Sequence, residues 1–125
     1  MSRKLTCAAV VFALAACNLL GQALSGTIVG TVTDQAGAVV PGAKVTLVNE
    51  GTQFTRTETA NVSGQYVAYS FPTGRVTVSI EQPGFQKLVR SGVELTAADT
   101  ITVNLQISVG NVQQTVEVKD EAPML

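Results

Sequence analysis

The sequence contains neither histidine nor tryptophan, and its two cysteines, Cys7 and Cys17, both lie near the amino terminus. Without histidine, the chain lacks the usual ligand of catalytic zinc and the usual base that activates a serine or cysteine nucleophile. Lysines and carboxylates remain as candidate bases, but none falls in a recognised catalytic motif. We therefore predict a protein that is not an enzyme, with no catalytic residue, no metal site and no cofactor.

An excess of positive charge is also lacking. The chain carries eight Lys and Arg residues against nine Asp and Glu residues, and its basic residues are scattered singly. Nucleic-acid backbones are bound by clustered positive charge, so we expect no nucleic-acid partner. Because no cysteine follows residue 17, a folded domain beyond that point must be stabilised by packing instead of disulfides.

Residues 1–23 have the pattern of a secretory signal peptide. Arg3 and Lys4 precede an apolar run, residues 5–16, that is too short to span a bilayer as a stable helix. The small residues Gly21 and Ala23 suit a signal-peptidase site. Cleavage there releases a chain that starts at Leu24, with six basic and nine acidic side chains and a net charge of about −3.

A second cleavage site is possible at residues 14–17. Their sequence, Leu-Ala-Ala-Cys, resembles the lipobox of bacterial lipoproteins, in which Cys17 is lipidated and becomes the first residue. The leader fits both processing routes. Lipidation at Cys17 would attach the domain to a membrane.

From residue 27 onward, apolar and polar residues alternate with a period of two, and Gly, Pro, Asn or Asp interrupts the pattern every eight to twelve residues. This pattern is typical of an antiparallel sandwich. The expected strands span residues 27–34, 43–49, 54–60, 65–70, 75–81, 85–90, 93–95 and 100–107. The sequence therefore predicts one all-β domain, a seven- to eight-stranded antiparallel β-sandwich.

The same alternation predicts which side chains face the core. The first strand turns three residues inward, the second three and the fifth three: Ile28, Gly30, Val32, Ala43, Val45, Leu47, Val76, Val78 and Ile80. In the third strand, Arg56 and Glu58 are two residues apart and share a face that we expect to be exposed. In the last strand, Ile101, Val103, Leu105 and Ile107 share one face.

Few aromatic rings are available for ligand binding. The candidates beyond the leader are Phe54, Tyr66, Tyr69, Phe71 and Phe85. Sugar sites commonly combine an exposed ring with amide and hydroxyl groups. We expect Tyr66 and Phe85 to pack in the core, whereas Tyr69 alternates onto the face opposite Tyr66. Tyr69 is therefore the candidate ligand-binding residue.

Acidic and amide side chains lie at several predicted turns. Asp34 and Asp99 could contribute to a cation site, but such residues at turns ordinarily accept hydrogen bonds from their own backbone. Asn61 begins a sequon-like Asn-Val-Ser triplet and is also interpreted as a turn residue. The sequence thus predicts structural roles for all three.

Five motifs occur in a characteristic order. They are Gly30-Thr31-Val32-Thr33-Asp34 with Gly37, Pro41-Gly42-Ala43, Asn61-x-Ser63-Gly64-x-Tyr66, Pro72-x-Gly74 and Pro83-Gly84-Phe85. Together they resemble the carboxypeptidase regulatory-like domain, which implies a prealbumin-like, Greek-key sandwich of the carbohydrate-binding-like fold over residues 24–107. The sequence departs from that family at Thr73, where proline usually recurs, and at Val76, where tyrosine is common.

The segments on either side of this domain point to a more specific group of relatives. A leader before it and a β-prone connector, residues 108–125, after it resemble the amino-terminal extension of Oar-like TonB-dependent outer-membrane receptors, in which a plug and a barrel follow. The chain is then a truncated relative or the isolated accessory domain.

The resemblance implies an exported, non-catalytic accessory or interaction module, located in the periplasm or at the outer membrane or cell surface of a Gram-negative-type bacterium. Its partner would be a glycan or a neighbouring envelope protein, the latter reached by strand pairing along residues 112–118. The alternatives are a weak carbohydrate-binding module and a cell-surface lipoprotein. Contact with a membrane would come only from lipidated Cys17 or a missing barrel.

Overall fold

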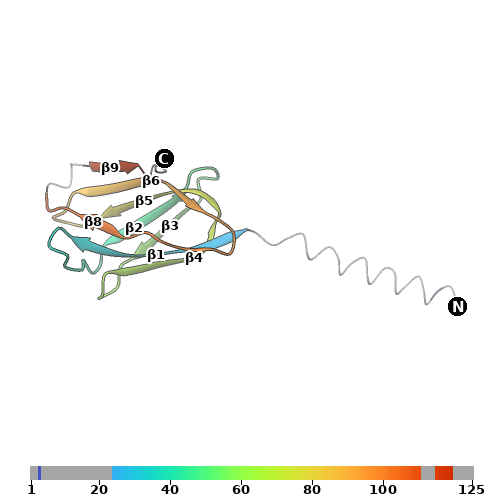
Figure 1. Cartoon of the computed structure of the whole chain (residues 1–125), viewed down its shortest axis with the longest axis horizontal. Helices are drawn as coiled ribbons and strands as arrows, with labels where there is room; N and C mark the ends of the chain where they lie inside the picture. Colours follow the sequence, from blue (N-terminus) through green and yellow to red (C-terminus); the bar gives the residue numbers. More distant parts are fainter. Residues whose placement is uncertain (1–2, 4–23, 111–114, 120–125) are drawn as a thin grey trace, which may run out of the picture.

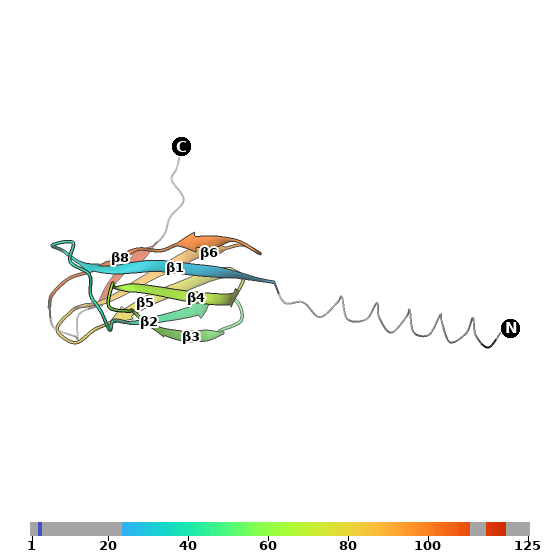
Figure 2. The ribbon, with the colours of Figure 1, turned by 90° about the horizontal axis from the view of Figure 1, so that it is seen from below.

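The computed structural model describes residue 3, residues 24–110 and residues 115–119, and this part of the chain beyond the leader is built from strands. The predicted apolar run, the Gly21–Ala23 site and Cys17 lie outside the described residues. The strands are β1 (Ser25–Asp34), β2 (Lys44–Asn49), β3 (Thr55–Thr59), β4 (Gln65–Pro72), β5 (Gly74–Glu81), β6 (Lys87–Leu95), β7 (Thr100–Thr102), β8 (Leu105–Ile107) and β9 (Thr115–Lys119). They form two stacked layers (Figure 1), and in Figure 2 β1, β4 and β8 lie in front of β5. The predicted all-β sandwich is confirmed.

The two sheets differ in size and in strand direction. In the four-stranded sheet, β1 pairs with β4 on one side and with β7 and β8 on the other. The five-stranded sheet has the order β3-β2-β5-β6-β9. Both sheets are mixed, in contrast to the predicted antiparallel pairing, because β7 and β8 run parallel to β1 and β9 runs parallel to β6. Each of these strands pairs with a strand that is not its neighbour in the sequence, so no hairpin turn forces the two to run antiparallel.

The predicted core residues of the first, second and fifth strands are all buried. Val103, Leu105 and Ile107 are also buried, and Ile101 packs against the core in part. The predicted strand over residues 100–107 is divided into β7 and β8. At this break the Val103 N–H donates to the Val29 carbonyl over 2.7 Å, and the Asn104 Oδ1 accepts the Thr31 N–H over 3.1 Å, so a side chain completes the ladder of β1.

The expectation for Arg56 and Glu58 was wrong. In the β2–β3 ladder Arg56 pairs with Leu47 and Glu58 pairs with Val45, so both share the face that those core residues present. Both are half-buried, and the threonines of β3 are the exposed side chains. The reason is that β3 lies at the edge of its sheet, where a long side chain can cover the apolar interior and keep its charge near water.

Strand β6 joins two stretches that the sequence predicted separately. Between Val76–Val93 and Val78–Arg90 the pairing with β5 shifts register, so Ser91 and Gly92 together lie opposite Thr77. Gly92 has a φ of 75°, a left-handed conformation that suits glycine. A β-bulge therefore lets one strand continue through residues 91–92.

Part of the predicted connector tail belongs to the five-stranded sheet, because β9 pairs with Lys87 to Ser91 of β6. Residues 111–114 and 120–125 of that tail lie outside the described part of the chain. Among the described residues, no helix is both long enough and apolar enough to cross a membrane.

Candidate functional site

The outer face of the four-stranded sheet carries a shallow hollow of about 230 Å3, which we name the outer-face hollow. It arises where two rows of outward side chains lie across β4 and β1, because Gln65 pairs with Thr31 and Val67 pairs with Val29. Its lining residues are Val29, Gly30, Thr31, Gln65, Tyr66, Val67, Thr102 and Asn104. The hollow is thus lined by two valines together with hydroxyl and amide groups.

Among the described residues, the outward side chains of this sheet are uncharged. Its outward residues alternate along β1, β4, β7 and the β7–β8 link, and they include Thr27, Val29, Thr31, Thr33, Gln65, Val67, Tyr69, Thr100, Thr102 and Asn104. None of these ten residues is acidic or basic. The outer face of the five-stranded sheet differs, since it carries ion pairs at Arg75–Glu94 and Lys87–Glu81.

Tyr69 lies on β4 two residues beyond Val67, and its side chain is 69% exposed. Tyr66, by contrast, is 2% exposed, so the predicted placement of the two rings on opposite faces is confirmed. Tyr69 sits in a second bulge: Gly26 pairs with Phe71 and Ile28 with Ala68, which leaves Tyr69 and Ser70 together opposite Thr27. Ser70 has a φ of 51°, a left-handed conformation that is uncommon for a residue with a side chain.

Arg56 holds this bulge from the other sheet. Its guanidinium donates a hydrogen bond to the Tyr69 carbonyl. The same guanidinium lies 5.5 Å from the ring centroid of Phe54 and 5.8 Å from that of Phe71, within the range of a cation–π interaction. Phe54 and Phe71 meet edge to face at 5.5 Å. One side chain thus joins the edge strands β3 and β4.

Sequence reasoning missed this role of Arg56. The contact joins residues from two sheets, and alternation within one strand carries no information about the opposite layer. The available signal was the pair of aromatic residues, Phe54 and Phe71, each at the end of a predicted strand beside a turn. That signal is too weak to identify a partner, because aromatic residues at such positions pack in many different ways.

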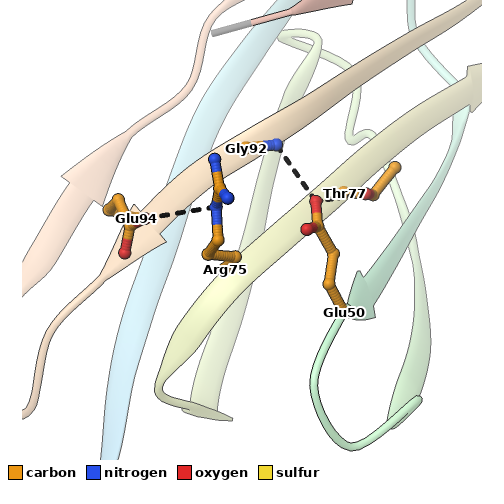
Figure 3. Close-up of polar contacts among 5 residues, drawn as sticks. All are labelled: Glu50, Arg75, Thr77, Gly92 and Glu94. Carbon is orange, nitrogen blue, oxygen red and sulfur yellow. Dashed lines mark hydrogen bonds and ion pairs between the residues drawn. The ribbon is translucent and has the colours of Figure 1, made fainter. Parts of the chain in front are cut away.

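A polar cluster occupies the outer face of the five-stranded sheet (Figure 3). The Glu50 Oε1 accepts the Thr77 hydroxyl over 2.9 Å and the Gly92 N–H of the β6 bulge over 3.1 Å. The Gly92 N–H, then the Thr77 hydroxyl and more weakly the charge of Arg75 lower the pKa of the Glu50 carboxyl below its ordinary value, although partial desolvation opposes them. These bonds connect the β2–β3 hairpin to the bulge, which is a structural role.

The turn residues behave as the sequence predicted. The Asp34 Oδ1 accepts the N–H groups of Ala36 and Ala38, and Asp99 accepts the Thr100 N–H and the Thr96 hydroxyl. Within residues 24–110 and 115–119, no three metal-ligating side chains are grouped. Asp34 and Asp99 are accordingly assigned to their turns.

Asn61 also serves its own turn, because its Oδ1 accepts the N–H groups of Ser63 and Gln65, each over 2.9 Å. Phe85 is half-buried and packs against the core, as expected. Phe71 is fully buried, and Phe54 is 41% exposed. Of the predicted aromatic candidates, Tyr69 therefore presents the most accessible ring.

Comparison with known proteins assigns the sandwich to a domain family. The profile of the carboxypeptidase regulatory-like domain family matches residues 27–108. No curated protein matches the chain significantly. The profile covers every strand of the sandwich except β9, together with the hollow and Tyr69.

Solved structures with a similar fold come from proteins of several kinds. The TIE protein of Bacillus anthracis is 20% identical, with a TM-score of 0.59 over 69% of this chain and 17% of that one. Catechol 1,2-dioxygenase from Acinetobacter radioresistens is 16% identical, with a TM-score of 0.58 over 83% and 57%. A putative carbohydrate-binding protein from Bacteroides uniformis is 17% identical, with a TM-score of 0.52 over 67% and 41%.

The chain spans less than two thirds of each of these three proteins. At such identities the likeness shows the fold alone, because one fold hosts many functions and function belongs to the site. The reaction of the dioxygenase therefore does not transfer to this chain.

Proposed function

Since the chain belongs to the carboxypeptidase regulatory-like domain family, we propose that it is an exported, non-catalytic accessory module that binds a partner on the outer face of its four-stranded sheet. The observation that carries this proposal is the outer-face hollow, an accessible concave surface lined by valines and by hydroxyl and amide groups. The acidic side chains near the loops are engaged in turns, which leaves them poorly suited to acid–base catalysis.

Export is supported by the leader pattern at residues 1–23 and by the resemblance to the amino-terminal extension of TonB-dependent receptors. The proposed location is the periplasm, outer membrane or cell surface of a Gram-negative-type bacterium. The intact mass of the protein isolated from its native host tests both export and the site of leader cleavage. A mass that begins at Leu24 supports a freely exported or receptor-linked domain, a lipid-modified mass that begins at Cys17 supports a lipoprotein, and a retained leader contradicts export.

A carbohydrate is the partner that this surface fits best. The amide and hydroxyl groups of Gln65, Thr102 and Asn104 can each exchange hydrogen bonds with sugar hydroxyls. Tyr69 supplies an exposed ring beside them. The similar Bacteroides uniformis protein, described as a putative carbohydrate-binding protein, is consistent with this proposal.

Isothermal titration against a glycan panel tests this partner. We expect heat of binding with at least one oligosaccharide at millimolar concentration. Tyrosine fluorescence offers a second readout, because Tyr69 is exposed, Tyr66 is buried and the chain has no tryptophan. Sugar should protect the emission from iodide quenching, and the absence of both effects would remove carbohydrate binding.

A second candidate is strand pairing with a neighbouring envelope protein. Strand β9 is the last strand of the described five-stranded sheet, and its Val116 and Val118 remain 41% and 45% exposed although they share the face of Leu88. Edge strands with exposed valines are templates for strand addition. Deleting residues 111–125 should leave the sandwich folded and abolish capture of the partner, and unchanged capture would exclude this surface.

A further inference from the structure

We propose that the outer face binds an uncharged glycan of at least two sugar units, one stacked on Tyr69 and the next seated in the outer-face hollow, and that Arg56 is the residue that positions Tyr69 for this contact. The inference rests on the proposed carbohydrate binding. It adds the charge of the ligand, its minimal length and a residue that acts through Tyr69.

The charge of the ligand follows from the surface. None of the ten outward residues of the four-stranded sheet named above is acidic or basic. A uronate, sulfate or phosphate group placed there would lose part of its hydration without gaining an ion pair. A neutral sugar exchanges its hydration for hydrogen bonds to amides and hydroxyls, which both donate and accept as sugar hydroxyls do. The surface therefore favours neutral glycans over acidic ones.

The length of the ligand follows from the spacing along β4. Val67 lines the outer-face hollow, and Tyr69 lies two residues further along the same strand. Two residues of a strand span about 7 Å, a distance comparable to the length of one hexose unit in a chain. A single sugar can occupy the ring or the hollow, whereas two linked units reach both.

The position of Tyr69 depends on the bulge that carries it. Tyr69 and Ser70 lie opposite the single residue Thr27, and Ser70 adopts a φ of 51°. A left-handed residue with a side chain persists only where its surroundings hold it. The Arg56 guanidinium donates to the Tyr69 carbonyl and itself contacts the rings of Phe54 and Phe71. Arg56 thus holds the backbone from which the ring projects, without lying on the ligand face.

Titration of the full chain with charged and neutral oligosaccharides tests the ligand class. The probes are cellotetraose, xylotetraose, maltotetraose, glucose and tetragalacturonic acid. We expect at least one neutral tetrasaccharide to bind, glucose to bind at least about tenfold more weakly because it reaches one subsite, and tetragalacturonic acid not to bind. Equal or tighter binding of the acidic chain, or of glucose, overturns the inference but leaves carbohydrate binding standing. No binding of any probe overturns both.

Variants of Tyr69 and Gln65 test whether these side chains contact the glycan. Tyr69→Ala should weaken the best neutral tetrasaccharide at least about tenfold, while Tyr69→Phe, which keeps the ring, should retain most of the affinity. Gln65→Ala should weaken binding of the tetrasaccharide. At a fixed sugar concentration it should therefore also reduce the protection of Tyr69 emission from iodide. Thr57→Ala, on the exposed face of β3, is the matched control and should change neither.

The role of Arg56 has its own readout. Arg56→Lys keeps the charge but loses the planar guanidinium, so we expect weaker sugar binding, measured well below the melting temperature of the variant so that it remains folded. In the Tyr69→Ala background the same change should have no further effect on affinity, because Arg56 acts through Tyr69. Unaltered affinity in Arg56→Lys, or equal losses in both backgrounds, contradicts the positioning role.

Discussion

Gly30 and Tyr66 are directly paired across the β1–β4 ladder, and the Tyr66 ring fills the space that a side chain at position 30 would need. The Tyr66 hydroxyl then donates to the Val103 carbonyl over 2.5 Å, which ties β4 to the link between β7 and β8. The two residues belong to separate motifs of the sequence, 36 positions apart in the chain. Their contact explains why a glycine and a tyrosine stand at these places in the core.

Gly30→Ala should destabilise the domain. A Cβ at position 30 would lie 1.9 Å from the Val103 carbonyl oxygen and 2.7 Å from the Tyr66 ring. Backbone cannot yield as a flexible side chain can, so we expect a loss of about 1–3 kcal/mol in the free energy of unfolding, or more. Urea denaturation measures it. Gly51→Ala, whose Cβ would meet only ordinary contact, is the control, and equal losses at both positions would contradict the explanation.

Tyr66→Phe should cost about 1–3 kcal/mol of unfolding free energy, because the buried Val103 carbonyl loses its hydroxyl donor. The variant keeps the ring over Gly30, so the loss isolates the hydrogen bond from the packing. Chemical denaturation at neutral pH measures it. Tyr69→Phe removes an exposed hydroxyl and should change stability by less than about 0.5 kcal/mol.

The stability of the native domain should fall at alkaline pH. Burial raises the pKa of the Tyr66 hydroxyl well above its ordinary value of 10, and the charge of Arg90 offsets this only in part. The stabilisation is fully present below pH 10, and it is lost as the pH rises from there toward the raised pKa, because the unfolded chain releases the proton first. The free energy of unfolding should fall by up to about 1.4 kcal/mol per pH unit. Tyr66→Phe should flatten this slope. Identical slopes in the two proteins would show that ionisation of Tyr66 does not cause the loss of stability.

Glu50→Gln should change the response to acid. The lowered pKa of Glu50 means that its contribution is present above the unfolded value of 4.5 and is lost as the pH falls through the folded value. The melting temperature of the variant should therefore lie below that of the native chain at neutral pH, and the two should converge in acid. Glu94→Gln, which removes an exposed partner of Arg75, is the control. A gap that persists at low pH would show that the charge of Glu50 is not its cause.

Asn49→Ala should be among the most damaging substitutions outside the apolar core. Asn49 is 2% exposed, and its amide donates to the Pro72 and Thr73 carbonyls and accepts the Gly51 and Thr52 N–H groups, all within 3.1 Å. Removing it leaves four backbone groups without these partners, so we expect a loss of about 2–4 kcal/mol in calorimetry or denaturation. Asn61→Ala, at an exposed turn, should cost clearly less.

The strand alternation predicted the core well because burial of one face is a local property of each strand. Val76, Val78 and Ile80 were placed inward from their spacing alone, and all three are buried. The same rule was wrong for Arg56 and Glu58, since their polarity indicated exposure whereas their pairing with Leu47 and Val45 turned them inward. At a sheet edge, polarity no longer decides which face is which.

The bulges were also beyond the sequence pattern. Ser70 has no special local sequence that requires its left-handed conformation, and Gly92 is one of 11 glycines in the chain. Each bulge exists because the partner strand is one residue shorter between its fixed pairs. The resulting positions of Tyr69 and of the Gly92 N–H depend on that register.

By itself, the sequence determined the class of fold, the inward residues of most strands and the turn roles of Asp34, Asp99 and Asn61. These follow from side-chain period and from hydrogen bonds between residues a few positions apart. The tertiary structure alone decided which strands run parallel, how Arg56 reaches Tyr69 and where the outer-face hollow lies. Those features join residues from distant strands, and strand register and the stacking of the layers set which of them meet.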